Sequence, residues 1–139
     1  MQKLYYHATD REFERFSRSY MASKGASNGH LGVWVGNERS DCEAYGNVIM
    51  TLSIPECAPY PMCYRELKAM HDHVRDMSAD EAAGYYRAFS ESLLDQGYTV
   101  IDIIEDHELP SHSILLDVES VTIEERELRD DPRFRWGAS

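Results

Sequence analysis

Residues 29–46 read Gly-His-Leu-Gly-Val-Trp-Val-Gly-Asn-Glu-Arg-Ser-Asp-Cys-Glu-Ala-Tyr-Gly, and this stretch decides the fold that we expect. Its Val-Trp-Val run predicts a short strand. Asn37 can cap a helix over 38–45, which the following glycine would end. Trp34 and Tyr45 then stand eleven positions apart, on a strand and on the helix that follows it. Two aromatic rings held in this way can face each other across a flat ligand ring.

Strands and helices mix along the rest of the chain without regular alternation. Apolar periodicity predicts strands over 3–7, 33–35, 47–54, 98–104, 112–116 and 121–123. It predicts helices over 64–76 and 82–94, the second after a capping-box sequence at 78–81. The proline-containing stretch 55–62 is expected to be irregular. This order favours an α+β fold. No G-x-G-x-x-G follows a strand, so a Rossmann mode of dinucleotide binding is not expected.

Size and charge narrow the class of protein. The 139 residues suit one domain, which we expect over 1–125, followed by a charged tail over 126–139. A formal net charge of −11 argues against direct nucleic-acid binding, which needs basic surface. No run approaches the roughly 20 apolar residues of a membrane span. Three cysteines without C-x-x-C spacing suit a reducing cytoplasm.

Several residue types match the needs of one reaction, cleavage of the bond between nicotinamide and ribose. That reaction passes through an oxocarbenium-like state, as glycoside hydrolysis does, and its leaving group departs neutral. The site must therefore supply a negative charge near the ribose, a clamp on the nicotinamide and donors that orient the sugars. The sequence offers Glu105 or Asp106 for the charge, Trp34 with Tyr45 for the clamp, and His7 for orientation.

These residues resemble the motifs of ADP-ribosyltransferases of the diphtheria-toxin and poly(ADP-ribose) polymerase branch. Gly32-Val33-Trp34 followed by Ala44-Tyr45-Gly46 resembles the second motif of that branch, with Trp34 where tyrosine is usual. Tyr6-His7-Ala8-Thr9 resembles the first motif. The strand that ends in Glu105-Asp106 is similar to one in small phage-borne ADP-ribosyltransferases, including one kind of anti-CRISPR protein.

The resemblance implies a fold with small split mixed or antiparallel sheets and flanking helices around an NAD cleft. It implies that NAD is the substrate, that His7 binds a ribose hydroxyl and that the backbone near Ala8 holds the carboxamide. Trp34 and Tyr45 would sandwich the nicotinamide ring. The implied cofactor-binding residues are His7, Ala8, Thr9, Gly32, Trp34 and Tyr45. The implied catalytic acid is Glu105 or Asp106, with Glu108 as a further option.

We therefore expect a mono-ADP-ribosyltransferase that modifies a macromolecular acceptor, most simply a protein of a bacterial host or of a CRISPR effector complex. An NAD glycohydrolase and a non-catalytic acidic inhibitor on the same fold stay open as alternatives. Each residue also has a structural interpretation: core aromatics at 34 and 45, a structural histidine, and an acidic pair in a solvated turn. No metal is expected, because His71 and His73 would point to different faces of a helix.

Overall fold

The computed structural model describes residues 3–9, 15–17, 27–104 and 112–130. The strands are β1 (Tyr5–Thr9), β2 (Val33–Gly36), β3 (Val48–Ser53), β4 (Pro59–Cys63), β5 (Val100–Ile104), β6 (His112–Leu115) and β7 (Thr122–Leu128). The α-helices are α1 (Tyr64–Val74) and α2 (Ala79–Asp95). Short 3-10 helices are η2 (Ser27–Leu31), η3 (Arg39–Asp41), η4 (Glu43–Tyr45) and η5 (Val118–Ser120). Within these ranges no helix has both the length and the apolar character that crossing a membrane requires.

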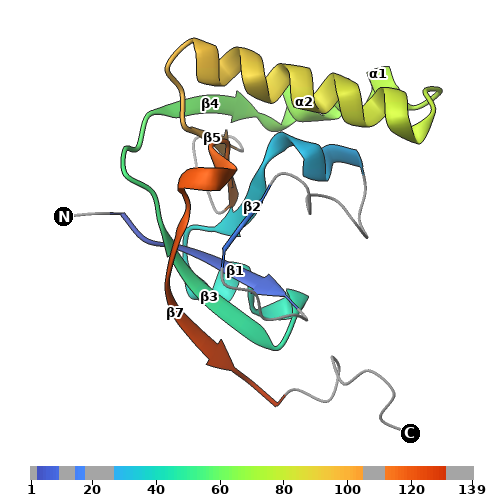
Figure 1. Cartoon of the computed structure of the whole chain (residues 1–139). Coiled ribbons are helices and arrows are strands. Elements are labelled where there is room, and N and C mark those ends of the chain that lie inside the picture. Colours follow the sequence, from blue (N-terminus) through green and yellow to red (C-terminus); the bar gives the residue numbers. More distant parts are fainter. Residues whose placement is uncertain (1–2, 10–14, 18–26, 105–111, 131–139) are drawn as a thin grey trace, which may run out of the picture.

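The strands form one seven-stranded mixed sheet in the order β4-β5-β6-β2-β1-β3-β7, so the expected α+β class is confirmed. Only β4 and β5 run parallel; the other neighbours are antiparallel. Figure 1 shows α1 and α2 lying over β4 at one end of the molecule, and β1, β3 and β7 at the other. The expected split into separate sheets is corrected, because the two halves are joined by the pair Tyr6–Gly36 between β1 and β2.

Two apolar clusters stabilise the two faces of this sheet. The side chains of β2 alternate between them: Val33 and Val35 belong to one cluster, and Trp34 packs against the other, which includes Met70 and Tyr86 of the helices. Side chains at successive positions of a strand point to opposite faces, so both faces of β2 are covered. This explains why the strand reads as an unbroken Val-Trp-Val run rather than as an apolar-polar alternation.

The strand β4 was not expected, because its sequence contains Pro59 and Pro61. Among the described strands it forms the edge of the sheet and pairs only with β5. Every second residue of a strand directs its backbone groups to the same side, so both prolines can face the open edge, where no N–H donor is needed. The prediction of an irregular segment over 55–62 holds for 55–58 and was wrong for 59–62, for this physical reason.

The expected helix over 38–45 is replaced by η3 and η4, and Asn37 is not its cap. Glu38 begins the first turn instead, and its backbone N–H donates to Oδ2 of Asp41 over 3.0 Å. Asn37 donates its side-chain amide to the Ser113 hydroxyl, 2.8 Å away. The segment is therefore short turns packed onto β1 and β2 rather than a regular helix.

The other predicted elements agree with the structure to within a few residues. Ser78 caps α2 by accepting a hydrogen bond from the Glu81 backbone N–H over 3.2 Å, which confirms the predicted start of this helix. The Glu81 carboxylate accepts from the Ser78 hydroxyl, also over 3.2 Å. The strand β7 continues to Leu128, beyond the expected end of the domain at residue 125. Arg129 follows it directly and contacts the backbone oxygens of Glu43 and Gly46.

Candidate functional site

The strands β1 and β2 part at the position of the first two sequence motifs. Their antiparallel pairing consists of Tyr6 with Gly36, whereas β1 pairs with β3 along its whole length, from Tyr5 to Thr9. If the register continued, Ala8 would lie opposite Trp34. We call this place the β1–β2 junction and define it by Tyr6–Thr9 of β1 and Val33–Gly36 of β2. Of the predicted site residues within it, His7 and Trp34 are in contact, whereas Ala8 packs beside Cys42 and Ile49 and Thr9 pairs with Val48 of β3.

His7 connects the two strands where their ladder stops. Its Nδ1 lies 2.8 Å from the carbonyl oxygen of Trp34. A carbonyl can only accept, so Nδ1 carries the proton, and in the neutral ring Nε2 is an acceptor. The ring meets Phe16 edge-on, with centroids 5.3 Å apart. Burial lowers the pKa of His7, partly opposed by the hydrogen bond to Trp34, so the ring is neutral at pH 7.

Gly32 lets β2 and β6 approach closely beside Trp34. A Cβ atom at position 32 would stand 2.2 Å from the backbone oxygen of Leu115. Any larger residue would push the two strands apart, because the obstacle is backbone. Trp34 itself is partly buried and packs against the cluster under the helices. The predicted cofactor-binding role of Gly32 is therefore accompanied by a clear structural role.

Tyr45 lies at the end of η4 with its side chain largely in solvent, 65% exposed. The turn behind it is tightly packed: Cys42 is buried beside Ala8 and Ile49. A Cβ atom at Gly46 would stand 2.4 Å from the backbone oxygen of Thr9. The backbone of η4 thus rests on the C-terminal end of β1, while the Tyr45 ring stays available for a ligand or a partner.

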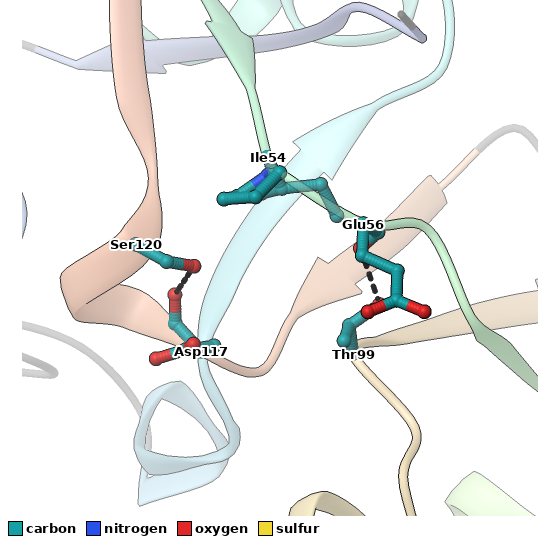
Figure 2. A pocket seen from close by; sticks show the side chains of 6 residues that line it. Ile54, Glu56, Thr99, Asp117 and Ser120 are labelled. Carbon is teal, nitrogen blue, oxygen red and sulfur yellow. Dashed lines mark hydrogen bonds between the residues drawn. The ribbon is translucent and has the colours of Figure 1, made fainter.

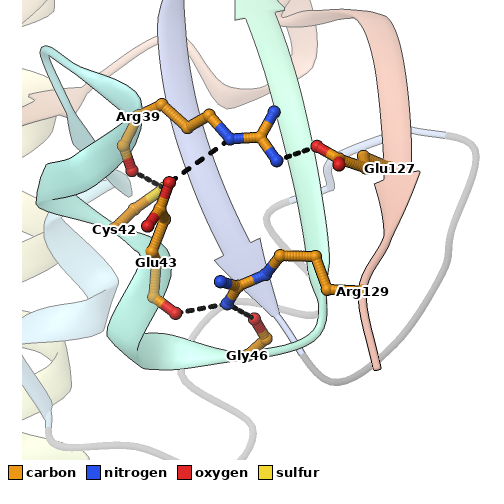
Figure 3. Close-up of polar contacts among 6 residues, drawn as sticks. All are labelled: Arg39, Cys42, Glu43, Gly46, Glu127 and Arg129. Carbon is orange, nitrogen blue, oxygen red and sulfur yellow. Dashed lines mark hydrogen bonds and ion pairs between the residues drawn. The ribbon is translucent and has the colours of Figure 1, made fainter. Parts of the chain in front are cut away.

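Arg129 fixes this turn from the opposite side, and sequence reasoning missed it. Its Nη2 donates to the backbone oxygens of Glu43 and Gly46, the latter 2.6 Å away (Figure 3). Arg39 bridges to Glu43 at 3.4 Å and also pairs with Glu127 of β7. The arginine was assigned to a solvated tail because a charged C-terminal sequence carries no periodic signal that would place it.

The predicted catalytic acids Glu105 and Asp106, and the further option Glu108, lie outside the described residues. The strand that leads to them is as predicted: β5 ends at Ile104 and pairs with β6. Its Asp102 accepts a hydrogen bond from the buried Ser113 hydroxyl over 2.6 Å. The hydroxyl donates its one hydrogen to Asp102, so it acts as the acceptor for the side-chain N–H of Asn37. Oδ1 of Asn37 is buried and has no hydrogen-bond partner among the described residues.

A separate hollow of about 140 Å³ is lined by residues outside the β1–β2 junction (Figure 2). It is lined by Ile54, Pro55, Glu56, Thr99, Asp117 and Ser120. The Thr99 and Ser120 hydroxyls donate to the backbone oxygens of Glu56 and Asp117, each over 2.8 Å. None of the predicted site residues lines it. A hollow of this volume is far smaller than the pockets that hold drug-sized ligands, so it does not fit a dinucleotide.

In the described ranges, histidine, cysteine, aspartate and glutamate form no group of three or more that could hold a metal ion. The residues that are described at the β1–β2 junction fit the nicotinamide end of NAD in their chemistry. His7 provides a neutral ring whose Nε2 is an acceptor, and Trp34 a partly buried aromatic face. The exposed ring of Tyr45 lies outside the junction, on η4.

Comparison with known proteins gives little beyond this geometry. No family model matches the chain, and no curated protein matches it. One similar solved structure is described as the crystal structure of an anti-CRISPR protein. It has a TM-score of 0.49 and 12% sequence identity, over 91% of this chain and 96% of that one. A likeness this distant carries no argument about function, which has to be argued from the residues.

Proposed function

We propose that this protein binds the nicotinamide end of NAD at the β1–β2 junction and transfers ADP-ribose to a macromolecular acceptor. The observation that supports the proposal most directly is the hydrogen bond from His7 to the Trp34 carbonyl at the point where the two strands part. It places the residues of two separate motifs in contact. It also leaves Nε2 of His7 able to accept a hydrogen bond from a ribose hydroxyl.

The two aromatic side chains supply the clamp in this proposal. The nicotinamide ring of NAD is cationic, and the faces of tryptophan and tyrosine attract a cation. Stacking contributes on the order of 0.5–1.5 kcal/mol per aromatic pair beyond burial of area. Tyr45 is exposed in the protein as described, which is the state expected of a ring whose partner is a ligand.

The acidic pair supplies the negative charge that the reaction requires near the ribose. The bond between C1′ of the ribose and the nicotinamide nitrogen breaks, and its electron pair neutralises the pyridinium. A nucleophile of the acceptor forms the new bond to C1′ and loses its proton. The carboxylate of Glu105 or Asp106 would stabilise the positive charge that develops on the ribose between these events. With water as the acceptor, the same residues would make an NAD glycohydrolase.

A second candidate, a non-catalytic acidic inhibitor, is favoured by the charge of the protein. The chain has a formal net charge of −11. Glu124, Glu125 and Glu127 are exposed along the edge strand β7. A surface of this kind suits a basic macromolecular partner and would steer its approach. A protein of a CRISPR effector complex is the partner to test first for either candidate, because the sequence resemblance extends to small phage proteins of that kind.

Release of nicotinamide from NAD tests the enzymatic proposal, and labelled NAD followed into protein separates a transferase from a glycohydrolase. The variant that carries both Glu105→Gln and Asp106→Asn keeps the shape of both side chains and removes their charge. We expect it to bind NAD but to lose roughly 10²–10³ in rate, the usual effect of one well-placed electrostatic group. Inhibition of the target that needs neither NAD nor these acids would favour the non-catalytic candidate.

A further inference from the structure

We infer that Arg129 is a positioning residue that holds the Tyr45 ring in place for nicotinamide; this inference rests on the proposed function. Arg129 contacts the backbone on either side of Tyr45 and does not contact the ligand. Its guanidinium reaches the carbonyl oxygens of Glu43 and Gly46, which lie on either side of Tyr45 in the chain (Figure 3). Two bonds to one rigid group fix both ends of the short segment that carries the ring.

The local structure explains why such a contact is needed. η4 is a three-residue 3-10 helix, and the last carbonyls of a helix have no partner within it. The Tyr45 backbone N–H donates to the Cys42 oxygen over 3.0 Å, and this is a single turn of hydrogen bonding. An isolated turn of this length is not stable without tertiary contacts. A cation at its C-terminal end satisfies the open carbonyls and also interacts favourably with their partial negative charge.

The position of Arg129 in the fold makes the contact rigid. Its backbone N–H donates to the Asn47 oxygen over 2.7 Å, which extends the β3–β7 ladder by one residue. The side chain is half-buried and rises from this fixed backbone to η4. Arg39, paired with both Glu43 and Glu127, adds a second connection between the same two elements. The segment 43–46 is thus held between β1 below it and β7 beside it.

Arginine is the appropriate side chain for this role. Its planar guanidinium presents several N–H donors in a fixed arrangement, whereas lysine has one compact ammonium on a flexible stem. Arg129→Ala should therefore loosen the turn and let the Tyr45 ring move, at little cost to the core. A purely structural arginine would instead affect the stability of the protein without any specific connection to Tyr45.

A double-mutant cycle between Arg129→Ala and Tyr45→Ala separates these two cases, because residues that act as a unit are not additive. NAD affinity would be measured by calorimetric titration of the wild type, both single variants and the double variant. We expect Tyr45→Ala to weaken binding about three- to tenfold, in line with one stacked aromatic contact. Arg129→Ala should weaken binding by a similar or smaller factor in the wild-type background and by less than about twofold when Tyr45 is absent. Arg126→Ala removes the same charge three residues earlier, within β7, and is the matched control; it should change NAD affinity little.

Amide hydrogen exchange gives a second readout that does not need NAD. Arg129→Ala should accelerate exchange at Tyr45, whose amide bonds to Cys42, and leave the middle of α2 unchanged. Equal weakening of NAD binding by Arg129→Ala in both backgrounds would overturn the inference and leave the proposed function standing, as would unchanged exchange at Tyr45. A folded wild-type protein that does not bind NAD would overturn the proposed function itself, and the inference with it.

Discussion

The contribution of His7 to the stability of the protein depends on the protonation state of its ring. Its Nδ1–H bonds to the Trp34 carbonyl, and burial lowers its pKa below the ordinary value of 6.5. The unfolded chain therefore takes up the proton first as the pH falls. The free energy of unfolding receives the full contribution of the neutral ring above about pH 6.5 and loses it progressively below that value.

We expect the wild type to lose stability between pH 7.5 and 5 more steeply than His7→Asn, which can still donate a hydrogen bond to the carbonyl but does not titrate. Denaturant unfolding at a series of pH values measures the difference. Subtracting the two curves removes the contribution of the carboxylates that both proteins share. Parallel curves for the two proteins would show that His7 is not held in its neutral form.

Ser113 of β6 forms hydrogen bonds with Asp102 of β5 and with Asn37, the residue that follows β2. It is fully buried, donates to Asp102 and accepts from Asn37. Ser113→Ala would leave a buried amide donor and a carboxylate without this partner. We expect a loss of about 1–3 kcal/mol in the free energy of unfolding, the usual cost of a buried polar group left unsatisfied. Denaturant titration measures it, and a change below about 0.5 kcal/mol would mean that water replaces the hydroxyl.

At the scale of elements, the packing of η4 on β1 depends on the absence of a side chain at position 46. A Cβ there would meet the Thr9 backbone at 2.4 Å, whereas one at Gly84, inside α2, would meet nothing within 4 Å. Gly46→Ala should destabilise the protein by about 1–3 kcal/mol through overpacking. Gly84→Ala should stabilise it by roughly 0.5–1 kcal/mol, because alanine favours a helix interior.

Thermal unfolding of these two variants tests the contrast between them. The same chemical change is made twice, so differences in the unfolded chain largely cancel. Gly46→Ala should also weaken NAD binding if η4 carries the Tyr45 ring as proposed, while Gly84→Ala should not. Equal stability changes of the same sign would show that η4 does not rest on β1 as described.

Across the whole molecule, features that depend on local sequence could be predicted, and features that depend on the arrangement of the fold could not. The strands around Val33–Gly36 and Val48–Ser53 and the capped helix α2 were predictable, because apolar periodicity and a capping box are local signals. The strand β4 was not predictable, because a strand accepts prolines only at the edge of a sheet, and local sequence does not show which strand forms the edge. The proximity of His7 to Trp34 followed only from family resemblance, and the contact of Arg129 with η4 joins positions too distant for any local pattern.

The single mixed sheet connects the two halves of the molecule through a narrow contact. The sheet narrows to one pair at Tyr6–Gly36, and the candidate binding residues His7 and Trp34 lie beside that pair, one on each strand. A ligand held there would contact both halves of the protein. The proposed function therefore depends above all on stacking of nicotinamide against Trp34.

Tryptophan fluorescence tests this claim most directly. Trp136→Phe leaves Trp34 as the single tryptophan of the chain, so its emission reports on the junction alone. We predict that NAD quenches this emission saturably, and that ADP-ribose, which lacks the nicotinamide ring, does not. Emission that NAD leaves unchanged, or that ADP-ribose quenches equally, would contradict the placement of nicotinamide against Trp34.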